Sequence, residues 1–562
     1  MTAYVIVGAG PSGLFTAWRL LTSGKLKAGD SVRLFEWADS EVGGRIRTYS
    51  FPECGGQYIE AGGMRFATQV DGDTIIGGHV LVQNLVRALG LQPLVVDFIE
   101  SSSRLYYLRG QNIFEHEIPK SGSPLPYYFD LAFMNKGYND MSADAIMAEA
   151  AKVFAPGSEN WTRVQWRDYF SNGVLTRDVG GVFKAGTRIS DIGYWNLLYE
   201  FLGDEGFNYV SDANGYSSSV INWNSADAMK GNCEYGSTVA YKRLAGGYGK
   251  LFHALRDAIA ARDPDCIRMK SRLVSYVYEE HAEKFLCEFE DAGANRRFEV
   301  TADVLVLAMP RRSLEMVAAC CGADCALNQP SVRNYIESSL DQPSVKVGML
   351  FDTAWWTDTD VVHYLPRTSD SIGGPSITDL PLRQTYYFGN NAVNATTGGP
   401  YVVLASYDDM VYESFWRELE IEGRRTTAQS HNCQALNGPT ILPPDSTLER
   451  MVMSQLASVH GVRKGKSLPA PIKTLFMDWG TDPFGGGYHA WAAHYDIPDV
   501  MMKMRAPAIE MLGGKQKLFI TGSCYSIDQS WVEGALCTAE SVLQDYLGLE
   551  PFCGTPDGYC LI

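Results

Sequence analysis

Long apolar runs are missing from this sequence, and no segment is apolar over the roughly 20 residues that a membrane-spanning helix needs. Positive charge is also scarce, with 48 Lys and Arg against 65 Asp and Glu and a net charge of −17. Nucleic acids and anionic membranes both require a basic face on their protein partners. The composition therefore argues against nucleic acid and membrane as partners.

No C-x-x-C pair occurs among the twelve cysteines, which favours reduced thiols over a disulfide framework. Cys320, Cys321 and Cys325 form a cluster with no histidine close in sequence, so we interpret them as ordinary thiols and expect no metal site. No apolar leader precedes the first expected strand at residue 4, which predicts a cytoplasmic protein.

The composition is otherwise that of a globular protein, with 46% hydrophobic and 20% charged residues. A chain of 562 residues is too long for one simple core, so two to three domains are expected.

The first 36 residues carry a dinucleotide-binding pattern. An apolar run at 4–7 leads into Gly8, Gly10 and Gly13, then a helical pattern, then a second apolar run that ends on Glu36. Glycines at this spacing allow a tight turn, close approach of the backbone to a pyrophosphate, and close packing of helix on strand. An acid about 20 residues further on accepts from ribose hydroxyls. Pro11 and Ser12 open the helix whose N-terminus would face the phosphates.

A second glycine pair, Gly43-Gly44, is followed by Arg45 and Thr48. This G-G-R-x-x-T sequence resembles that of the flavin-containing amine oxidase superfamily, which includes monoamine, polyamine and L-amino-acid oxidases. The resemblance implies FAD, bound non-covalently, with the glycines and arginine extending along its pyrophosphate. Small residues allow the backbone to approach the phosphates closely, and the forked N–H groups of arginine donate to phosphate oxygens.

The next motif, Gly62-Gly63-Met64-Arg65, resembles the G-x-M-R turn of the L-amino-acid oxidase family, whose arginine pairs with the substrate carboxylate. A desolvated carboxylate needs a bidentate cationic partner, and a plain amine substrate does not. Arg65 is therefore the residue that separates amino-acid from amine oxidation. A structural ion pair within the FAD domain is the alternative role.

Two further residues, Lys346 and Tyr407, belong to the expected catalytic group, which also contains Arg65 and Trp531. Lys346 is the single lysine of an apolar run, and the stretch resembles the family segment whose lysine holds a water against the reactive ring nitrogen of the flavin. Burial would lower its pKa; a solvent-facing lysine on an edge strand is the alternative. Tyr407 fits the family tyrosine that shares the carboxylate with the arginine, with a slip to Ser406 left open.

The C-terminal stretch Trp531-Val532-Glu533-Gly534-Ala535 resembles the family's G-W-x-E-G-A pattern, in which the tryptophan packs the substrate over the flavin. The sequence departs from the family twice. Gly522-Ser523 replaces a Gly-Glu pair whose glutamate contacts the ribityl chain, and Ser530 replaces a glycine.

The resemblance assigns the remaining contacts by position. Val274 is expected to contact the adenine through its backbone. The expected cofactor-binding residues are Gly8, Gly10, Pro11, Ser12, Gly13, Glu36, Gly44, Arg45, Gly63, Met64, Arg65, Val274, Gly522, Ser523, Trp531, Val532 and Ala535. Those expected around the substrate are Arg65, Tyr407, Trp223, Tyr488, Trp491 and Trp531.

We expect an α/β fold with a Rossmann-like βαβ FAD-binding domain, an α+β substrate domain and a helical insertion. The aromatic-rich segment 124–235, with helical spacing and little strand alternation, is the insertion. The expected segments are 1–66, 236–312 and 515–562 for FAD, 67–123 and 313–514 for substrate, and 124–235 for the insertion.

The resemblance implies an FAD-dependent L-amino-acid oxidase that converts an L-amino acid and oxygen to a 2-oxo acid, ammonia and hydrogen peroxide. The alternatives are an amine or polyamine oxidase, an amino-acid 2-monooxygenase and a non-catalytic flavoprotein. The expected partners are a small L-amino acid and oxygen, with a homo-oligomer implied by the family. Neither the preferred side chain nor the oligomeric state is fixed by the sequence.

Overall fold

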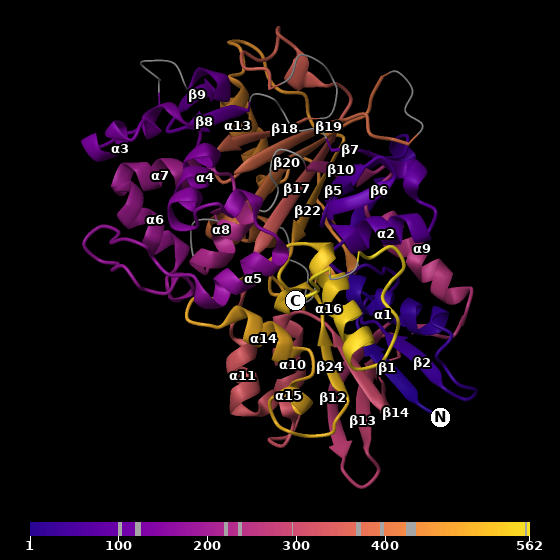
Figure 1. Cartoon of the computed structure of the whole chain (residues 1–562). Helices are drawn as coiled ribbons and strands as arrows, with labels where there is room; N and C mark the ends of the chain where they lie inside the picture. Colours follow the sequence, from indigo (N-terminus) through magenta and orange to yellow (C-terminus); the bar gives the residue numbers. More distant parts are fainter. Residues whose placement is uncertain are drawn as a thin grey trace.

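The computed structural model describes most of the chain (Figure 1). The described residues are 1–98, 104–118, 125–217, 223–233, 239–294, 296–366, 373–393, 398–422, 434–556 and 559–562.

A five-stranded parallel sheet forms the nucleotide-binding part, in the order β11-β2-β1-β15-β24. Its strands are β1 (Ala3–Val7), β2 (Ser31–Phe35), β11 (Ile267–Arg268), β15 (Val304–Ala308) and β24 (Leu518–Thr521). The carboxyl ends of parallel strands meet at one edge, so the turns after β1, β15 and β24 converge there with the end of β2. That edge is where a nucleotide site is expected.

Three helices pack together beside this sheet: α1 (Pro11–Thr22), α9 (Gly249–Ala260) and α16 (Val532–Asp545). Helix α1 begins with Pro11, whose fixed φ suits the first helical position. Helix α2 (Val80–Ala88) packs against α16. A three-stranded antiparallel sheet of β12 (Ser271–Glu279), β13 (Lys284–Asp291) and β14 (Arg296–Ala302) adjoins the parallel sheet.

The largest sheet has eight strands in the order β21-β22-β17-β20-β19-β18-β8-β9. Its strands are β8 (Leu105–Leu108), β9 (Gln111–Phe114), β17 (Ser344–Phe351), β18 (Gly373–Thr378), β19 (Gln384–Gly389), β20 (Tyr401–Asp409), β21 (Thr440–Ile441) and β22 (Lys473–Asp478). Every residue of β17 is buried, and the strand lies between β20 and β22. Lys346 is therefore on a central strand, which rules out the edge-strand alternative.

Smaller sheets join these parts. A four-stranded sheet contains β5 (Phe66–Asp71), β6 (Thr74–Gly78), β7 (Val95–Asp97) and β10 (Ala240–Leu244). Two-stranded sheets pair β3 (Thr48–Phe51) with β4 (Gln57–Glu60), and β16 (Ser339–Gln342) with β23 (Tyr488–Trp491).

The segment 124–235 is helical, as predicted, and its described residues contain no named strand. Its helices gather on one side of the molecule, in purple and magenta in Figure 1. They are α3 (Leu131–Asn135), α4 (Ala143–Phe154), α5 (Arg163–Asn172), α6 (Tyr194–Leu202), α7 (Asp204–Ala213) and α8 (Ser225–Cys233). Aromatic side chains supply much of the packing between them, including the rings of Phe129, Phe133 and Tyr209.

The remaining helices are α10 (Arg311–Cys320), α11 (Pro330–Ile336), α12 (Glu413–Glu422), α13 (Thr447–His460), α14 (Ile497–Met504) and α15 (Pro507–Glu510). The predicted mixed α/β fold with a parallel nucleotide-binding sheet is confirmed. The predicted domain boundaries stay predictions.

Candidate active site

The glycines after β1 differ in what surrounds them. Gly8 has φ +104°, and a Cβ there would lie 2.5 Å from the Ala308 carbonyl oxygen. A Cβ on Gly13 would lie 1.9 Å from the Gly8 carbonyl oxygen, so Gly13 serves the packing of α1 on the turn. A Cβ on Gly10 would meet nothing within 4 Å. Gly10 therefore faces open space, as a backbone that a ligand approaches closely must.

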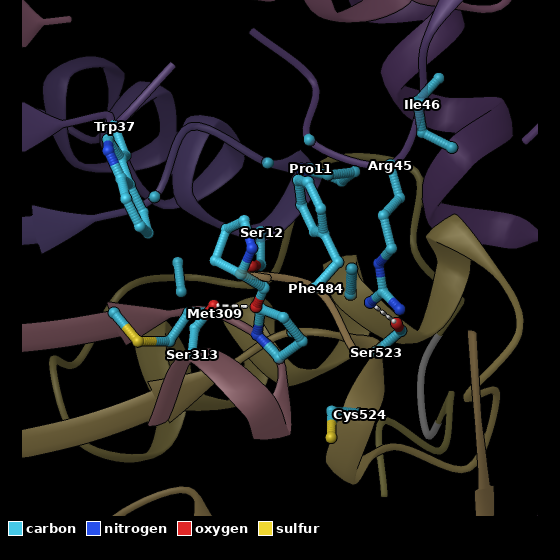
Figure 2. Close-up of a pocket in the computed structure, with 18 of the residues that line it drawn as sticks. Pro11, Ser12, Trp37, Arg45, Ile46, Met309, Ser313, Phe484, Ser523 and Cys524 are labelled. Atoms are coloured by element: carbon cyan, nitrogen blue, oxygen red, sulfur yellow. Dashed lines mark hydrogen bonds between the residues drawn. The ribbon is translucent and has the colours of Figure 1, made fainter. Parts of the chain in front are cut away.

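That open space belongs to a pocket at the carboxyl edge of the parallel sheet, here the first pocket (Figure 2). Most of the expected cofactor-binding residues line it: Gly8, Gly10, Pro11, Ser12, Glu36, Gly44, Arg45, Gly63, Gly522, Ser523, Trp531, Val532 and Ala535.

Glu36 is buried at the end of β2 and lines the first pocket. Its carboxylate accepts hydrogen bonds from the backbone N–H of Ala9 at 2.6 Å and of Ala38 at 2.8 Å. Burial raises the pKa of Glu36, and the two backbone donors oppose that rise. These bonds connect the carboxylate to the turn after β1 and to the residues that follow β2. Carboxylate oxygens can accept more than one hydrogen bond, so Glu36 can also accept from a ribose hydroxyl.

Arg45 reaches into the first pocket toward Ser523 (Figure 2). Its guanidinium donates to the Ser523 hydroxyl at 3.3 Å and to the Gly486 carbonyl oxygen at 3.4 Å, and lies 3.1 Å from Nδ1 of His489. Burial lowers the pKa of Arg45. None of these three partners is an anion, so the half-buried guanidinium is suited to bind one, and a pyrophosphate over the glycine turn would supply it.

A second pocket opens from the first. The two share walls formed by Arg45, Ile46, Gly63, Gly487, Tyr488, Gln529, Ser530, Trp531 and Val532. Five expected substrate residues line the second pocket, namely Arg65, Tyr407, Trp223, Tyr488 and Trp531, together with Lys346. A ligand that extends from the first pocket past these shared residues would therefore contact the expected substrate-binding residues of the second pocket.

Lys346 is 3% exposed and donates from Nζ to the carbonyl oxygens of Glu60 at 3.2 Å and Gly62 at 2.5 Å. Its Nζ also lies 4.5 Å from the centre of the Tyr407 ring. Burial lowers the pKa of Lys346 to about 7, although the Glu60 carboxylate favours the charged form. Burial also raises the pKa of Glu60, to about 7.

Arg65 lies over two aromatic rings, with its guanidinium carbon 4.4 Å from the centre of Tyr241 and 5.0 Å from that of Phe98. The Tyr241 ring in turn stacks on Trp531, with centroids 6.0 Å apart and an interplanar angle of 15°. Ring stacking engages the face of a guanidinium and not its N–H donors. The two aromatic rings thus orient Arg65 by the face of its guanidinium.

Tyr407 and Ser406 point to opposite sides of β20. The Tyr407 ring lines the second pocket and meets the Tyr216 ring edge-on at 5.4 Å. The Ser406 hydroxyl is buried and donates to the Leu382 carbonyl oxygen at 3.0 Å. Burial raises the pKa of Tyr407 well above its ordinary value, so its hydroxyl stays a donor. The structure therefore favours Tyr407 over Ser406 as the pocket residue.

Trp531 stands at the N-terminus of α16 and lines both pockets. Its ring meets the His79 ring at a centroid distance of 4.7 Å. Burial lowers the pKa of His79 to about 3, so this imidazole is neutral. The neighbouring Glu533 lies behind the pockets, where it accepts from the backbone N–H of Leu81 and Val82 at the start of α2.

The structure places several expected residues differently. Val274 does not line the first pocket, whereas Ser271, Arg272 and Leu273 do; Val274 lies at a bulge in β12, where the register shifts between Leu273 and Ser275. Met64 and Arg65 line the second pocket and not the first.

Trp491 lines neither pocket. Its side chain is fully buried and packs against Tyr525, with ring centroids 6.3 Å apart. His489, two residues earlier, lines the second pocket in its place.

A comparison with protein-family models matches residues 11–542 to the flavin containing amine oxidoreductase family. The chain belongs to this family. The resemblance inferred from the motifs is thereby confirmed, and with it FAD as the cofactor and an oxidoreductase activity on a small molecule with oxygen as acceptor.

Relatives extend over nearly the whole chain. Aplysianin-A of Aplysia kurodai is 25% identical over 98% of this chain and 91% of its own length. L-amino-acid oxidase 4 of Hebeloma cylindrosporum is 24% identical over 96% of this chain and 81% of its own length. A solved structure of putrescine oxidase bound to putrescine aligns with a TM-score of 0.61 and 14% identity, over 97% of this chain and 99% of that one. The last similarity shows a shared fold only.

The chain's own residues fit the family's cofactor. Arg45 and the open side of Gly10 would hold the pyrophosphate, and Glu36 would hold the adenosine ribose. Ser523 stands in place of the family's acid and gives Arg45 a neutral hydroxyl as its partner there, which leaves the guanidinium available to phosphate.

Tyr241, Tyr216 and His489 are among the residues of the second pocket that the sequence analysis did not identify. Tyr241 lies in β10, and no local sequence pattern marks it as a pocket residue. Among the described residues, no group of His, Cys, Asp and Glu is arranged to hold a metal ion. Within the same part of the chain, no helix has the length and apolarity to span a bilayer.

Proposed function

We propose that this flavoprotein is an L-amino-acid oxidase. The observation that carries the proposal is Arg65, held between Phe98 and Tyr241 in a pocket that also contains Tyr407 and Lys346 and opens onto the cofactor pocket. A guanidinium in such a pocket matches a substrate carboxylate, a group that a simple amine does not have.

The side chains divide the work as follows. Arg65 and the protonated Tyr407 hydroxyl bind the α-carboxylate. The Trp531 ring, which lines both pockets, packs against the substrate next to the cofactor pocket. Bound FAD supplies the two-electron oxidation of the substrate and the return of those electrons to oxygen. Lys346, neutral above about pH 7, holds a water or a proton at the inner end of the pocket. The imino acid product hydrolyses to a 2-oxo acid and ammonia.

A panel of the twenty L-amino acids, several D-amino acids and the corresponding amines, assayed for hydrogen peroxide, tests this proposal. We expect peroxide and ammonia from one or more L-amino acids. Peroxide from amines alone would indicate an amine oxidase, the activity named for the putrescine oxidase neighbour. Release of carbon dioxide with an amide product would indicate a monooxygenase. The absence of any product from every compound would indicate a non-catalytic flavoprotein.

The pH dependence of flavin reduction tests the role of Lys346. Its pKa is lowered from 10.5 to about 7, so the amine is mainly charged below that pH and mainly neutral above it. At saturating substrate, the anaerobic reduction rate is expected to rise as the pH increases through about 7.

Lys346→Met should remove that inflection and lower the limiting rate by roughly 100-fold, as loss of a proton-handling group does. Lys152→Met changes a lysine on helix α4, outside both pockets, and serves as the control. An unchanged inflection in Lys346→Met would assign the titration to another group.

A further inference from the structure

A thiol, an imidazole and a carboxylate lie together where the first pocket meets the second, outside the roles assigned above. Cys524 lines the first pocket and is 1% exposed, and Figure 2 shows it next to Ser523 and below Arg45. His489 lines the second pocket and is fully buried. Asp341, on β16, lies 3.2 Å from Nε2 of His489.

Polar groups surround the Cys524 sulfur. As a thiol, its Sγ donates to the Ser339 hydroxyl at 3.1 Å, and as a thiolate it would accept from the same hydroxyl. Burial acts to raise the pKa of Cys524, but the charge of His489 and hydrogen bonds from His489 and Ser339 outweigh it and lower that pKa. Burial likewise opposes the charged form of His489, yet Cys524 and Asp341 raise its pKa. A thiolate and an imidazolium are thus each favoured by the other.

Two other buried cysteines show the contrast, whereas Cys325, which is hydrogen-bonded to Cys321 and lines neither pocket, also has a lowered pKa. Cys266 and Cys287 lie in apolar surroundings, where burial raises their pKa to about 12. Such thiols are inert, because the thiolate is the reactive species. Cys524 is equally buried, so its different chemistry comes from the charged groups packed around it and not from exposure.

We propose that Cys524 is a redox-active thiolate in the wall of the cofactor pocket, paired with His489 and oxidised by hydrogen peroxide to a sulfenic acid. The sulfur attacks one peroxide oxygen, an S–O bond forms and the O–O bond breaks. The departing hydroxide takes a proton from the His489 imidazolium and becomes water. The sulfur loses two electrons and the peroxide gains them, so the step balances.

The charges that face the thiol are Arg45 and His489, which favour the thiolate, and Asp341, which opposes it but holds His489 in its charged form. Arg311 and Tyr525 also face the cluster. During turnover the peroxide would come from the oxidase reaction, so the physiological source rests on the proposed function. The thiol chemistry itself does not, because peroxide can be added directly.

The test exposes the full-length protein, with FAD and without it, to hydrogen peroxide in the presence of dimedone at pH 7. Peptide mass spectrometry then follows the sulfenic-acid adduct on each cysteine. We expect Cys524 to be labelled about tenfold faster than the exposed Cys320 and Cys553 in at least one of the two forms. Labelling no faster than those two thiols in both forms would overturn the proposal.

Two variants separate the proposed pair from general reactivity. Cys524→Ser should abolish the adduct on that peptide and leave the Cys320 adduct unchanged. His489→Gln keeps the thiol and removes the cation, so labelling of Cys524 should slow about tenfold while Cys320 is unaffected. An unchanged rate in a folded His489→Gln protein would contradict the pairing.

The wild-type pH profile gives an answer even if His489→Gln fails to fold. Labelling of Cys524 should persist to lower pH than labelling of Cys320, since its thiolate is stabilised. A Cys524 profile that coincides with that of Cys320 would overturn the proposal. None of these measurements depends on turnover, so their failure is distinguishable from failure of the oxidase assay.

Discussion

Arg65→Ala is expected to lower kcat/KM for L-amino acids by at least roughly 100-fold, equivalent to about 3 kcal/mol of lost transition-state binding. The reason is that a substrate carboxylate would enter the second pocket without its cationic partner, and a buried unpaired charge is costly. Steady-state kinetics on the best substrate of the panel measures the loss.

Two controls show whether the loss comes from the carboxylate. Arg109 also lies over a ring, 4.1 Å from the centre of Tyr127, but lines neither pocket, so Arg109→Ala should leave kcat/KM unchanged. Any slow oxidation of the decarboxylated amine should be affected little by Arg65→Ala. An equal loss on amino acid and amine would assign Arg65 a structural role, the alternative left open by the sequence.

Gly10→Val should weaken FAD binding by at least roughly 100-fold while the apoprotein remains folded. No protein atom lies within 4 Å of the Cβ position of Gly10, so the new side chain meets only the space where the pyrophosphate would lie. Flavin content, FAD titration by fluorescence and circular dichroism of the apoprotein check both parts of the expectation.

The chain offers a matched glycine. A Cβ on Gly322 also meets nothing within 4 Å, and Gly322 lies outside both pockets, so Gly322→Val should bind FAD normally. Gly13→Ala should instead disturb folding, because its Cβ would lie 1.9 Å from the Gly8 carbonyl oxygen. Normal flavin content in Gly10→Val would contradict the placement of the pyrophosphate.

The nucleotide-binding part was predictable because its signals are local. Gly8, Gly10, Gly13 and Glu36 form a pattern within one short stretch of sequence. In the structure, a side chain at Gly8 or Gly13 would clash with the backbone, whereas Gly10 faces open space. Lys346 was also readable, since one lysine in an apolar run is costly unless it has a role. The structure places it on a central strand with its Nζ on two carbonyl oxygens.

What the sequence did not reveal depends on long-range packing. Tyr241 meets Arg65 only because β10 pairs with β5 across more than 170 residues of chain. Val274 was misplaced because a bulge in β12 leaves no mark in the alternation of residues. Trp491 was misplaced because aromatic composition does not distinguish a core ring from a pocket ring.

We propose that the carboxylate of an amino acid, and not the amine alone, selects the substrate. The most direct measurement mixes the FAD-loaded protein anaerobically with L-lysine or cadaverine, and with L-phenylalanine or phenethylamine, and follows the flavin absorbance. We expect at least one of the two amino acids to bleach the flavin, and its matched amine to do so at least about 100-fold more slowly. Bleaching by an amine, with none by the matching amino acid, would contradict it.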